Sequence, residues 1–239
     1  MQSFKKRSVM VLGFLLIFGL YTLLILRNEY LQFLEIGEKY ANVFITDMKY
    51  KYLTMAVNFV VLFLSFYITT KLIKKGLKKF FEDEKKEMPK LPNKSISFII
   101  GLIISIFSTN QIYDKVILLL NGAWFGINDP IFNRDIGFYM FIRPFIWTIV
   151  IYWLLLIVVL VIYTVAYYIV VFNKFFDGVE RETLKSNMFI KQLLCSLFLV
   201  SLGVSGVLIL KSQDILFERF GTSIYGAGFT SITVKLWRI

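Results

Sequence analysis

Five long apolar runs, each free of Asp, Glu, Lys and Arg, alternate with charged connections along the chain. Each run is at least 18 residues long, and a helix of that length crosses the roughly 30 Å hydrocarbon core of a bilayer. The pattern predicts an all-α integral membrane protein, a bundle of about five transmembrane helices with interfacial amphipathic helices on the outer side. The predicted spans lie near residues 9–26, 52–70, 95–113, 144–172 and 192–210.

Composition supports a membrane setting. The 239 residues are 57% hydrophobic and 18% charged, whereas soluble domains hold about 45–50% apolar and about 25% charged residues. Histidine is absent, which removes the commonest general base and the commonest metal ligand. The single cysteine, Cys195, lies inside an apolar run. It cannot form an intrachain disulfide, and we expect it to be a small buried hydrophobe.

The distribution of basic residues predicts the orientation. Three basic residues precede the first run, and the connection 71–94 holds nine Lys against four acidic residues. Because cytoplasmic connections are rich in Lys and Arg, we expect a cytoplasmic N-terminus, with 71–94 and 174–191 also inside. This bias explains the net charge of +11 without nucleic acid, for which the sequence has no motif. The segment 71–94 has two compatible interpretations, a helix extension followed by a solvated loop, or a patch for anionic lipid headgroups.

The connections on the outer side contain further predicted helices. Between the first two spans, apolar side chains recur at helical spacing over residues 29–48 and predict one amphipathic helix in the outer interface. They are Tyr30, Phe33, Leu34, Gly37, Tyr40, Phe44 and Met48. Before the fourth span, the pattern predicts a second apolar helical stretch over Val116–Trp124, ended by Gly126 as its C-cap.

The loop 121–145 carries the most polar chemistry on the outer side. Asn128, Asp129, Asn133 and Asp135 are all oxygen-bearing, which permits two hypotheses. A cation such as Ca²⁺ needs about six to eight oxygen ligands, and further ligands would have to come from Asp114, Asp214 and Glu218. Turn and capping roles need only short-range partners. We favour capping, because two carboxylates with Arg134 between them are too few for a cation. The following segment, 135–142, is predicted to be extended or briefly helical.

The predicted spans contain no Asp, Glu, Lys, Arg or His, although such residues inside spans normally mark transport paths. Asn58 is the most polar side chain in a span core, and we expect it to form a hydrogen bond between helices. Four small residues near the end of the fifth span predict close helix–helix association: Ser201, Gly203, Ser205 and Gly206. We do not expect the glycine-rich stretch 226–228 to be a phosphate loop, because such loops are followed by a helix, whereas alternating Ile232, Val234 and Leu236 predict that a strand follows here.

The predicted organisation is a transmembrane domain over residues 1–210 and the start of an extracytoplasmic segment over 211–239. Lys211–Phe220 is predicted to form an amphipathic helix. Ser231–Ile239 alternates apolar and polar residues, which is typical of a strand with one buried face. A lone strand needs pairing partners, so the sequence is expected to be a truncated piece of a longer protein.

Three stretches resemble a known family. FGINDPIFNRDIGFYMFIRPF (125–145) resembles the F-G-x-x-D-P-x-F-x-x-D-I-x-F-Y-x-F-x-x-P-F segment of uncharacterised protein family 0182, a bacterial membrane-protein family. YGAGFTSITVKLWRI (225–239) resembles the stretch after that family's fifth span, and FLEIGEKYANVF (33–44) its first outer segment. The resemblance implies about seven spans followed by a large extracytoplasmic domain, and it implies no activity.

Three function classes follow. The first is a multi-pass cell-membrane protein that anchors and assembles a larger extracytoplasmic region. The second is a transporter or channel component, whose path would use uncharged polar groups or further spans of the longer protein that the resemblance implies. The third is an intramembrane enzyme, which the sequence disfavours because it shows no carboxylate pair and no activated nucleophile. We favour the anchor, and assign no catalytic, cofactor-binding or metal-binding residue.

Overall fold

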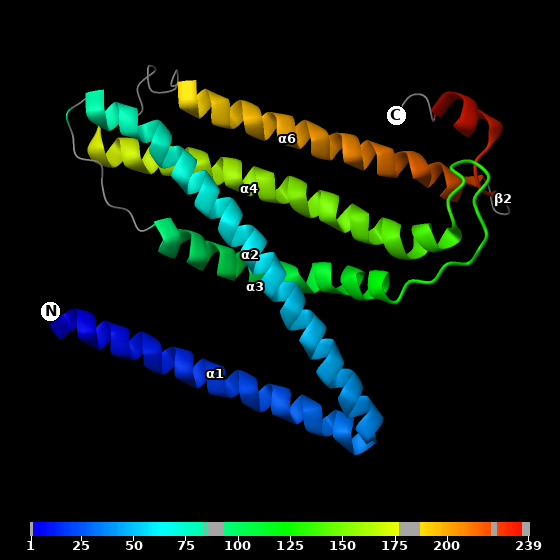
Figure 1. Cartoon of the computed structure of the whole chain (residues 1–239), viewed down its shortest axis with the longest axis horizontal. Coiled ribbons are helices and arrows are strands. Elements are labelled where there is room, and N and C mark those ends of the chain that lie inside the picture. The colour runs from blue at the N-terminus through cyan, green and yellow to red at the C-terminus, as the bar shows by residue number, and fades with distance from the viewer. Residues whose placement is uncertain (1, 84, 86–92, 177–186, 221–223, 236–239) are drawn as a thin grey trace. The chain divides into compact units, whose positions relative to one another are not determined.

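The computed structural model describes residues 2–83, 85, 93–176, 187–220 and 224–235, and divides into two compact units, residues 1–53 and 54–239 (Figure 1). Its long helices are α1 (Gln2–Ile36), α2 (Glu38–Asp83), α3 (Asn93–Leu120), α4 (Arg143–Phe175) and α6 (Asn187–Ser212). Shorter elements are η1 (Phe138–Ile142), η2 (Gln213–Phe217), η3 (Ser231–Lys235) and an antiparallel pair of two-residue strands, β1 (Arg219–Phe220) and β2 (Ile224–Tyr225). The predicted helical fold is confirmed.

Each predicted span lies within one helix: 9–26 in α1, 52–70 in α2, 95–113 in α3, 144–172 in α4 and 192–210 in α6. Four stretches of the described residues are long and apolar enough to cross a membrane: Glu38–Lys78, Asn93–Leu120, Phe138–Phe175 and Phe189–Phe217. These four stretches qualify by length and composition only. The predicted five membrane crossings therefore stay a prediction.

The first unit corrects the prediction of one amphipathic helix over residues 29–48. The helix ends at Ile36, and α2 begins at Glu38. Gly37 between them has φ of +149°, a conformation that side chains other than glycine rarely adopt. The chain therefore folds back, and the ring of Phe44 lies 5.2 Å from that of Phe33. Helical spacing alone predicted a continuous helix, because Gly37 falls in phase with its apolar neighbours.

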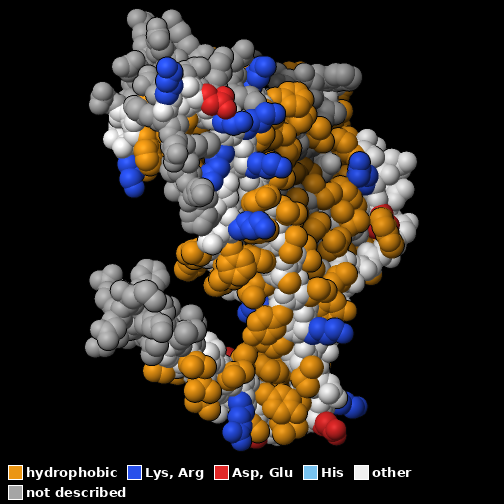
Figure 2. Space-filling view, turned by 60° about the vertical axis from the view of Figure 1, so that its left-hand side comes forward, with side chains coloured by type: hydrophobic (Ala, Val, Ile, Leu, Met, Phe, Trp, Pro, Cys, Tyr) orange, Lys and Arg blue, Asp and Glu red, His pale blue; other side chains and the backbone are white. Residues whose placement is uncertain are grey.

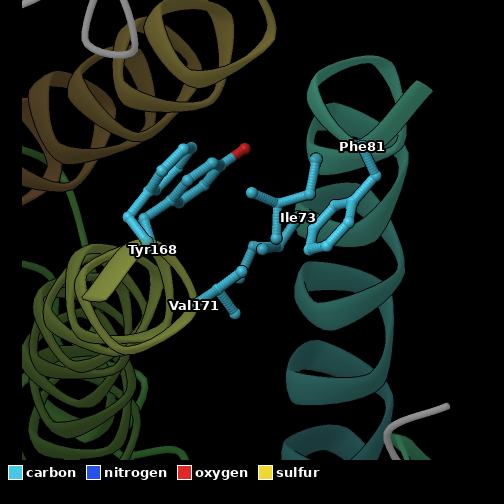
Figure 3. Packing of buried hydrophobic residues seen from close by; sticks show 6 residues of the cluster. Ile73, Phe81, Tyr168 and Val171 are labelled. Atoms are coloured by element: carbon cyan, nitrogen blue, oxygen red, sulfur yellow. The ribbon is translucent and has the colours of Figure 1, made fainter. Parts of the chain in front are cut away.

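The second unit packs the rest of α2 together with α3, α4 and α6. Helix α4 contacts both α3 and α6. The buried cluster at one end of α2 and α4 joins two sets of three residues: Ile73, Leu77 and Phe81 with Tyr168, Val171 and Phe172. Figure 3 shows the side chains of Ile73 and Phe81 facing those of Tyr168 and Val171. We call this the lysine end of the second unit, because Lys71, Lys74, Lys75 and Lys78 lie beside it on α2.

Three local predictions were wrong at the end of the second unit that lies opposite the lysine end. Helix α3 stops at Leu120, so residues 121–124 are not helical and Gly126 is not its C-cap. The predicted helix over 211–220 ends at Phe217, and residues 219–220 form β1. Residues 231–235 form the helical turn η3 rather than a strand, while 236–239 lie outside the described residues. A short run with period two cannot by itself separate a strand from a helical turn.

Candidate functional site: a loop platform at one end of the helices

The connecting loop, residues 121–137, joins α3 to the helical turn η1 that leads into α4. Its two arms pair through a bridge between Asn128 and Asp135. The backbone N–H of Asp129 donates to the carbonyl of Arg134 (2.9 Å), and that of Ile136 donates to the carbonyl of Ile127 (3.0 Å). The loop is therefore a small hydrogen-bonded hairpin rather than an open connection.

Asp129 closes the turn of this hairpin. Its Oδ1 accepts the backbone N–H groups of Ile131 (2.9 Å) and Phe132 (2.7 Å). Its Oδ2 accepts the N–H of Arg134 (2.9 Å) and the hydroxyl of Tyr139 (2.7 Å). The predicted turn role of Asp129 is confirmed, and the contact with Tyr139 also fixes the turn to η1.

Asp135 gathers three more backbone groups. Its carboxylate accepts the N–H groups of Phe125 (3.2 Å), Gly126 (2.7 Å) and Gly137 (2.6 Å). Asp135 is only 9% exposed, so these bonds replace those that water would otherwise make. Gly126 has a φ of +71°, a conformation that glycine adopts without strain, so the chain turns there beside the carboxylate. The two carboxylates together hold both arms of the loop in one geometry.

These bonds bear on the choice between the cation and capping hypotheses for the loop. Every carboxylate oxygen of Asp129 and Asp135 accepts at least one backbone donor, as the capping hypothesis requires. Among the described residues, no three His, Cys, Asp or Glu side chains gather closely enough to hold a metal ion. The arrangement serves backbone capping.

The loop should lose stability in acid. Partial burial raises the pKa of Asp129, but hydrogen bonds from Phe132, Arg134 and Tyr139 outweigh it and leave the pKa below 3.8. The pKa of Asp135 is likewise lowered, because bonds from Gly137, Phe125 and Gly126 outweigh desolvation. A lowered carboxyl pKa contributes stability that is complete above the unfolded value and lost as pH falls through the folded value.

We therefore expect the apparent Tm, followed by intrinsic fluorescence in detergent, to change little through these two groups between pH 7 and pH 5. It should fall from about pH 4 downward. Other carboxyl groups titrate in the same range, so the comparison is with the double variant Asp129→Asn, Asp135→Asn. That variant should be less stable at pH 7 and show a smaller acid-induced fall. An equal fall in both proteins would contradict the prediction.

A clamp centred on Arg143 ties the start of α4 to the end of α6. Its Nη2 donates to the backbone carbonyl of Leu210 (2.9 Å) and its Nε to Oε1 of Gln213 (3.2 Å), while Asp214 completes an ion pair. The side chain of Arg143 is 18% exposed and that of Asp214 57%. Because Asp214 is well solvated, the ion pair itself adds little. The clamp instead holds the last turn of α6 and the first turn of η2 against the start of α4, because Arg143 bonds to a carbonyl at the end of α6 and to a side chain of η2.

A polar cluster lies between α2, α3 and α4, away from the loop. The amide nitrogen of Asn58 donates to Ser108 Oγ (2.9 Å) and Thr109 Oγ1 (3.4 Å), and its carbonyl accepts the hydroxyl of Tyr152 (2.7 Å). Asn58 is 5% exposed. The predicted hydrogen bond between helices is therefore confirmed, with partners on two neighbouring helices.

The small residues of α6 divide into two groups. Gly203 packs on α4, since a Cβ there would come 2.5 Å from Leu154 Cδ2, and Gly206 faces Val150. Ser201 and Ser205 are exposed and bond to their own helix. Cys195 is also exposed, so its predicted burial was wrong. A helix that is apolar on all sides has no polar face, so its sequence does not show which residues face a neighbouring helix.

Sequence reasoning missed the partners of Arg143 and Tyr139. The partners of Arg143 lie 67 to 71 residues away, and only the packing of α4 on α6 brings them together. One signal was available, because Arg143 is the charged residue directly before a 30-residue uncharged run. The residues predicted as possible ligands were not all brought together: Asp129 and Asp135 share the loop, whereas Asp214 belongs to the clamp.

The fold and this site define a helical protein with four apolar stretches of membrane-spanning length. At one end of its helices lies the hydrogen-bonded connecting loop. The chain belongs to the Uncharacterised protein family UPF0182, whose family model matches residues 7–239, as the sequence resemblance indicated. No function is established for that family.

Curated relatives carry the same family name. The UPF0182 protein of Caldicellulosiruptor saccharolyticus is 29% identical over 212 residues, covering 87% of this chain and 23% of that protein. The UPF0182 protein of Clostridium acetobutylicum is 28% identical over 259 residues, covering 97% of this chain and 27% of that protein. The chain thus spans about a quarter of the length of these relatives. No solved structure matches it.

Proposed function

We propose that this chain is the membrane-embedded part of a multi-pass cell-membrane protein, and that it anchors and orients a larger extracytoplasmic region. The observation that carries the proposal is the clamp. Arg143 joins the start of α4 to Leu210, Gln213 and Asp214, so the chain beyond α6 leaves the helices in a fixed direction.

Exposed apolar surface supports the membrane part of the proposal. Leu155 of α4 and Leu197 of α6 are 59% and 64% exposed, and side chains of this kind recur along both helices. Large apolar surfaces of this extent are rare on soluble monomers, whereas lipid tails accommodate them. The length of the relatives supports the anchoring part, because a large region accompanies the matched segment in each of them.

The transporter alternative has less support. Within this chain, its path would use the polar cluster at Asn58, where the amide oxygen and nitrogen both have partners. A hydrogen-bonded cluster of this kind stabilises helix packing. We therefore retain the anchor as the proposed function.

Sidedness and the clamp can be tested together by thiol labelling in intact cells, in a Cys195→Ser background. Lys85→Cys should be shielded from a membrane-impermeant reagent, and the exposed Asn128→Cys should react. Ile215→Cys, at a position only 3% exposed, should react slowly. Adding Arg143→Gln should speed its reaction by about tenfold, since a hydrogen bond from a charged group contributes about 1.5 kcal/mol or more.

Arg134→Gln is the matched control, because the Arg134 guanidinium lies over the ring of Phe138 (4.4 Å) and takes no part in the clamp. It should leave the labelling rate of Ile215→Cys unchanged. Labelling of Lys85→Cys from outside would overturn the orientation. Equal rates with and without Arg143→Gln would overturn the orienting role while leaving the membrane setting intact.

A further inference from the structure

Four lysines of α2 lie on one face of that helix at the lysine end. Lys71, Lys74, Lys75 and Lys78 are three, four and seven residues apart, which places them side by side on a helix. Together with Ile68 and Leu72 they line a hollow of about 600 Å³. In the upper part of the view in Figure 2, Lys and Arg side chains gather next to continuous hydrophobic surface. The ammonium groups of the lysines thus lie next to apolar side chains.

A second hollow opens between α2, α4 and α6. Its volume is about 480 Å³, and most of its wall is apolar, with Trp153, Leu156, Leu160 and Leu199 among the lining residues. Lys191, Gln192 and Ser196 of α6 add a polar part to the wall. Ile68 and Leu72 line both hollows, so the two are neighbours that share a wall.

Within the described residues, Gln192 has one unsatisfied group in this region. Its side-chain oxygen Oε1 is buried and has no hydrogen-bond partner there. A buried amide oxygen without a donor is costly, and a ligand bearing a hydroxyl group would satisfy it once the Gln192 side chain turned toward the cleft.

We propose that the two hollows together bind one anionic glycerophospholipid. Its phosphate lies among the lysines of α2, and one acyl chain lies in the cleft between α2, α4 and α6. Charge complementarity selects the anionic headgroup, because basic side chains near a membrane surface attract acidic lipids. The long apolar cleft selects a lipid over a soluble anion, which would leave that cleft unfilled. After such a turn of the Gln192 side chain, the glycerol hydroxyls of a phosphatidylglycerol headgroup provide its donors. This assignment goes beyond the proposed anchor function.

Trp153 provides a probe inside the cleft. The chain has four tryptophans, and the variant Trp124→Phe, Trp147→Phe, Trp237→Phe retains only Trp153. This variant is reconstituted in phosphatidylcholine nanodiscs, and phosphatidylglycerol or phosphatidylcholine with brominated acyl chains is titrated in. Brominated phosphatidylglycerol should quench Trp153 with an apparent affinity at least about fivefold higher than that of brominated phosphatidylcholine, the effect expected of a single lysine near the surface.

Two matched lysine variants decide whether the preference comes from the proposed site. Lys71→Gln, Lys75→Gln, Lys78→Gln should abolish the preference for phosphatidylglycerol. Lys39→Gln, Lys49→Gln, Lys51→Gln removes equal charge from the other part of α2 and should retain it. Unchanged Trp153 emission in phosphatidylcholine alone shows that each variant is folded. Equal quenching by both lipids, or an unchanged preference after loss of the first three lysines, would overturn the proposal.

Discussion

Gly137→Ala should destabilise the protein more than any other single methyl addition to the connecting loop. A Cβ at this position would come 2.3 Å from the backbone carbonyl oxygen of Ala123 and 2.9 Å from Oδ1 of Asp135. Contacts below 3.0 Å to backbone atoms require the backbone to move. Both neighbours are fixed here, because Asp135 also holds the N–H groups of Phe125 and Gly126. We expect a loss of about 1–3 kcal/mol, as for other overpacked sites.

The measurement is the apparent Tm in detergent, followed by intrinsic fluorescence. Gly19→Ala is the control, since a Cβ there meets nothing within 4 Å and glycine is a poor residue inside a helix. Its Tm should stay the same or rise. If Gly137→Ala were as stable as Gly19→Ala, the close packing of the two arms of the loop would be refuted.

Asn58→Leu should have the second-largest effect, by loosening α2 from α3 and α4. The substitution removes the acceptor of the Tyr152 hydroxyl and the donor shared by Ser108 and Thr109. The two smaller hydroxyls retain bonds to their own helix, so Tyr152 is the group most affected. Hydrogen bonds between membrane helices contribute about 0.6 kcal/mol on average and up to about 1.7, so we expect a total loss of about 1–3 kcal/mol.

A double-mutant cycle with Tyr152→Phe isolates the contact between Asn58 and Tyr152. The free energy of unfolding in mixed micelles should show coupling, with the second substitution costing less once the first is present. Asn42→Leu is the matched control, because Asn42 lies on the same helix and its side chain is exposed. Additive effects of Asn58→Leu and Tyr152→Phe would show that the pair does not interact.

The sequence by itself determined the positions of the long helices and the roles of several polar residues. Each apolar run lies within one helix, because a long uncharged run satisfies its backbone groups most readily as a helix. Asp129 was predicted to close a turn, since its partners are two, three and five residues away. Asn58 was predicted to bond between helices, because a buried amide needs partners that its own apolar neighbours do not provide.

Tertiary structure decided where the chain turns back, which helix faces are exposed and which distant residues meet. The helix break at Gly37 depends on its φ of +149°, which helical periodicity does not reveal. Cys195 lies on an exposed face because the packing of α6 on α4 sets the rotation of a helix that is apolar on all sides. The clamp of Arg143 joins residues about 70 positions apart. The short-range pattern of the sequence does not indicate such a contact. Local chemistry thus specified helices and turns, whereas helix packing chose which of their side chains meet.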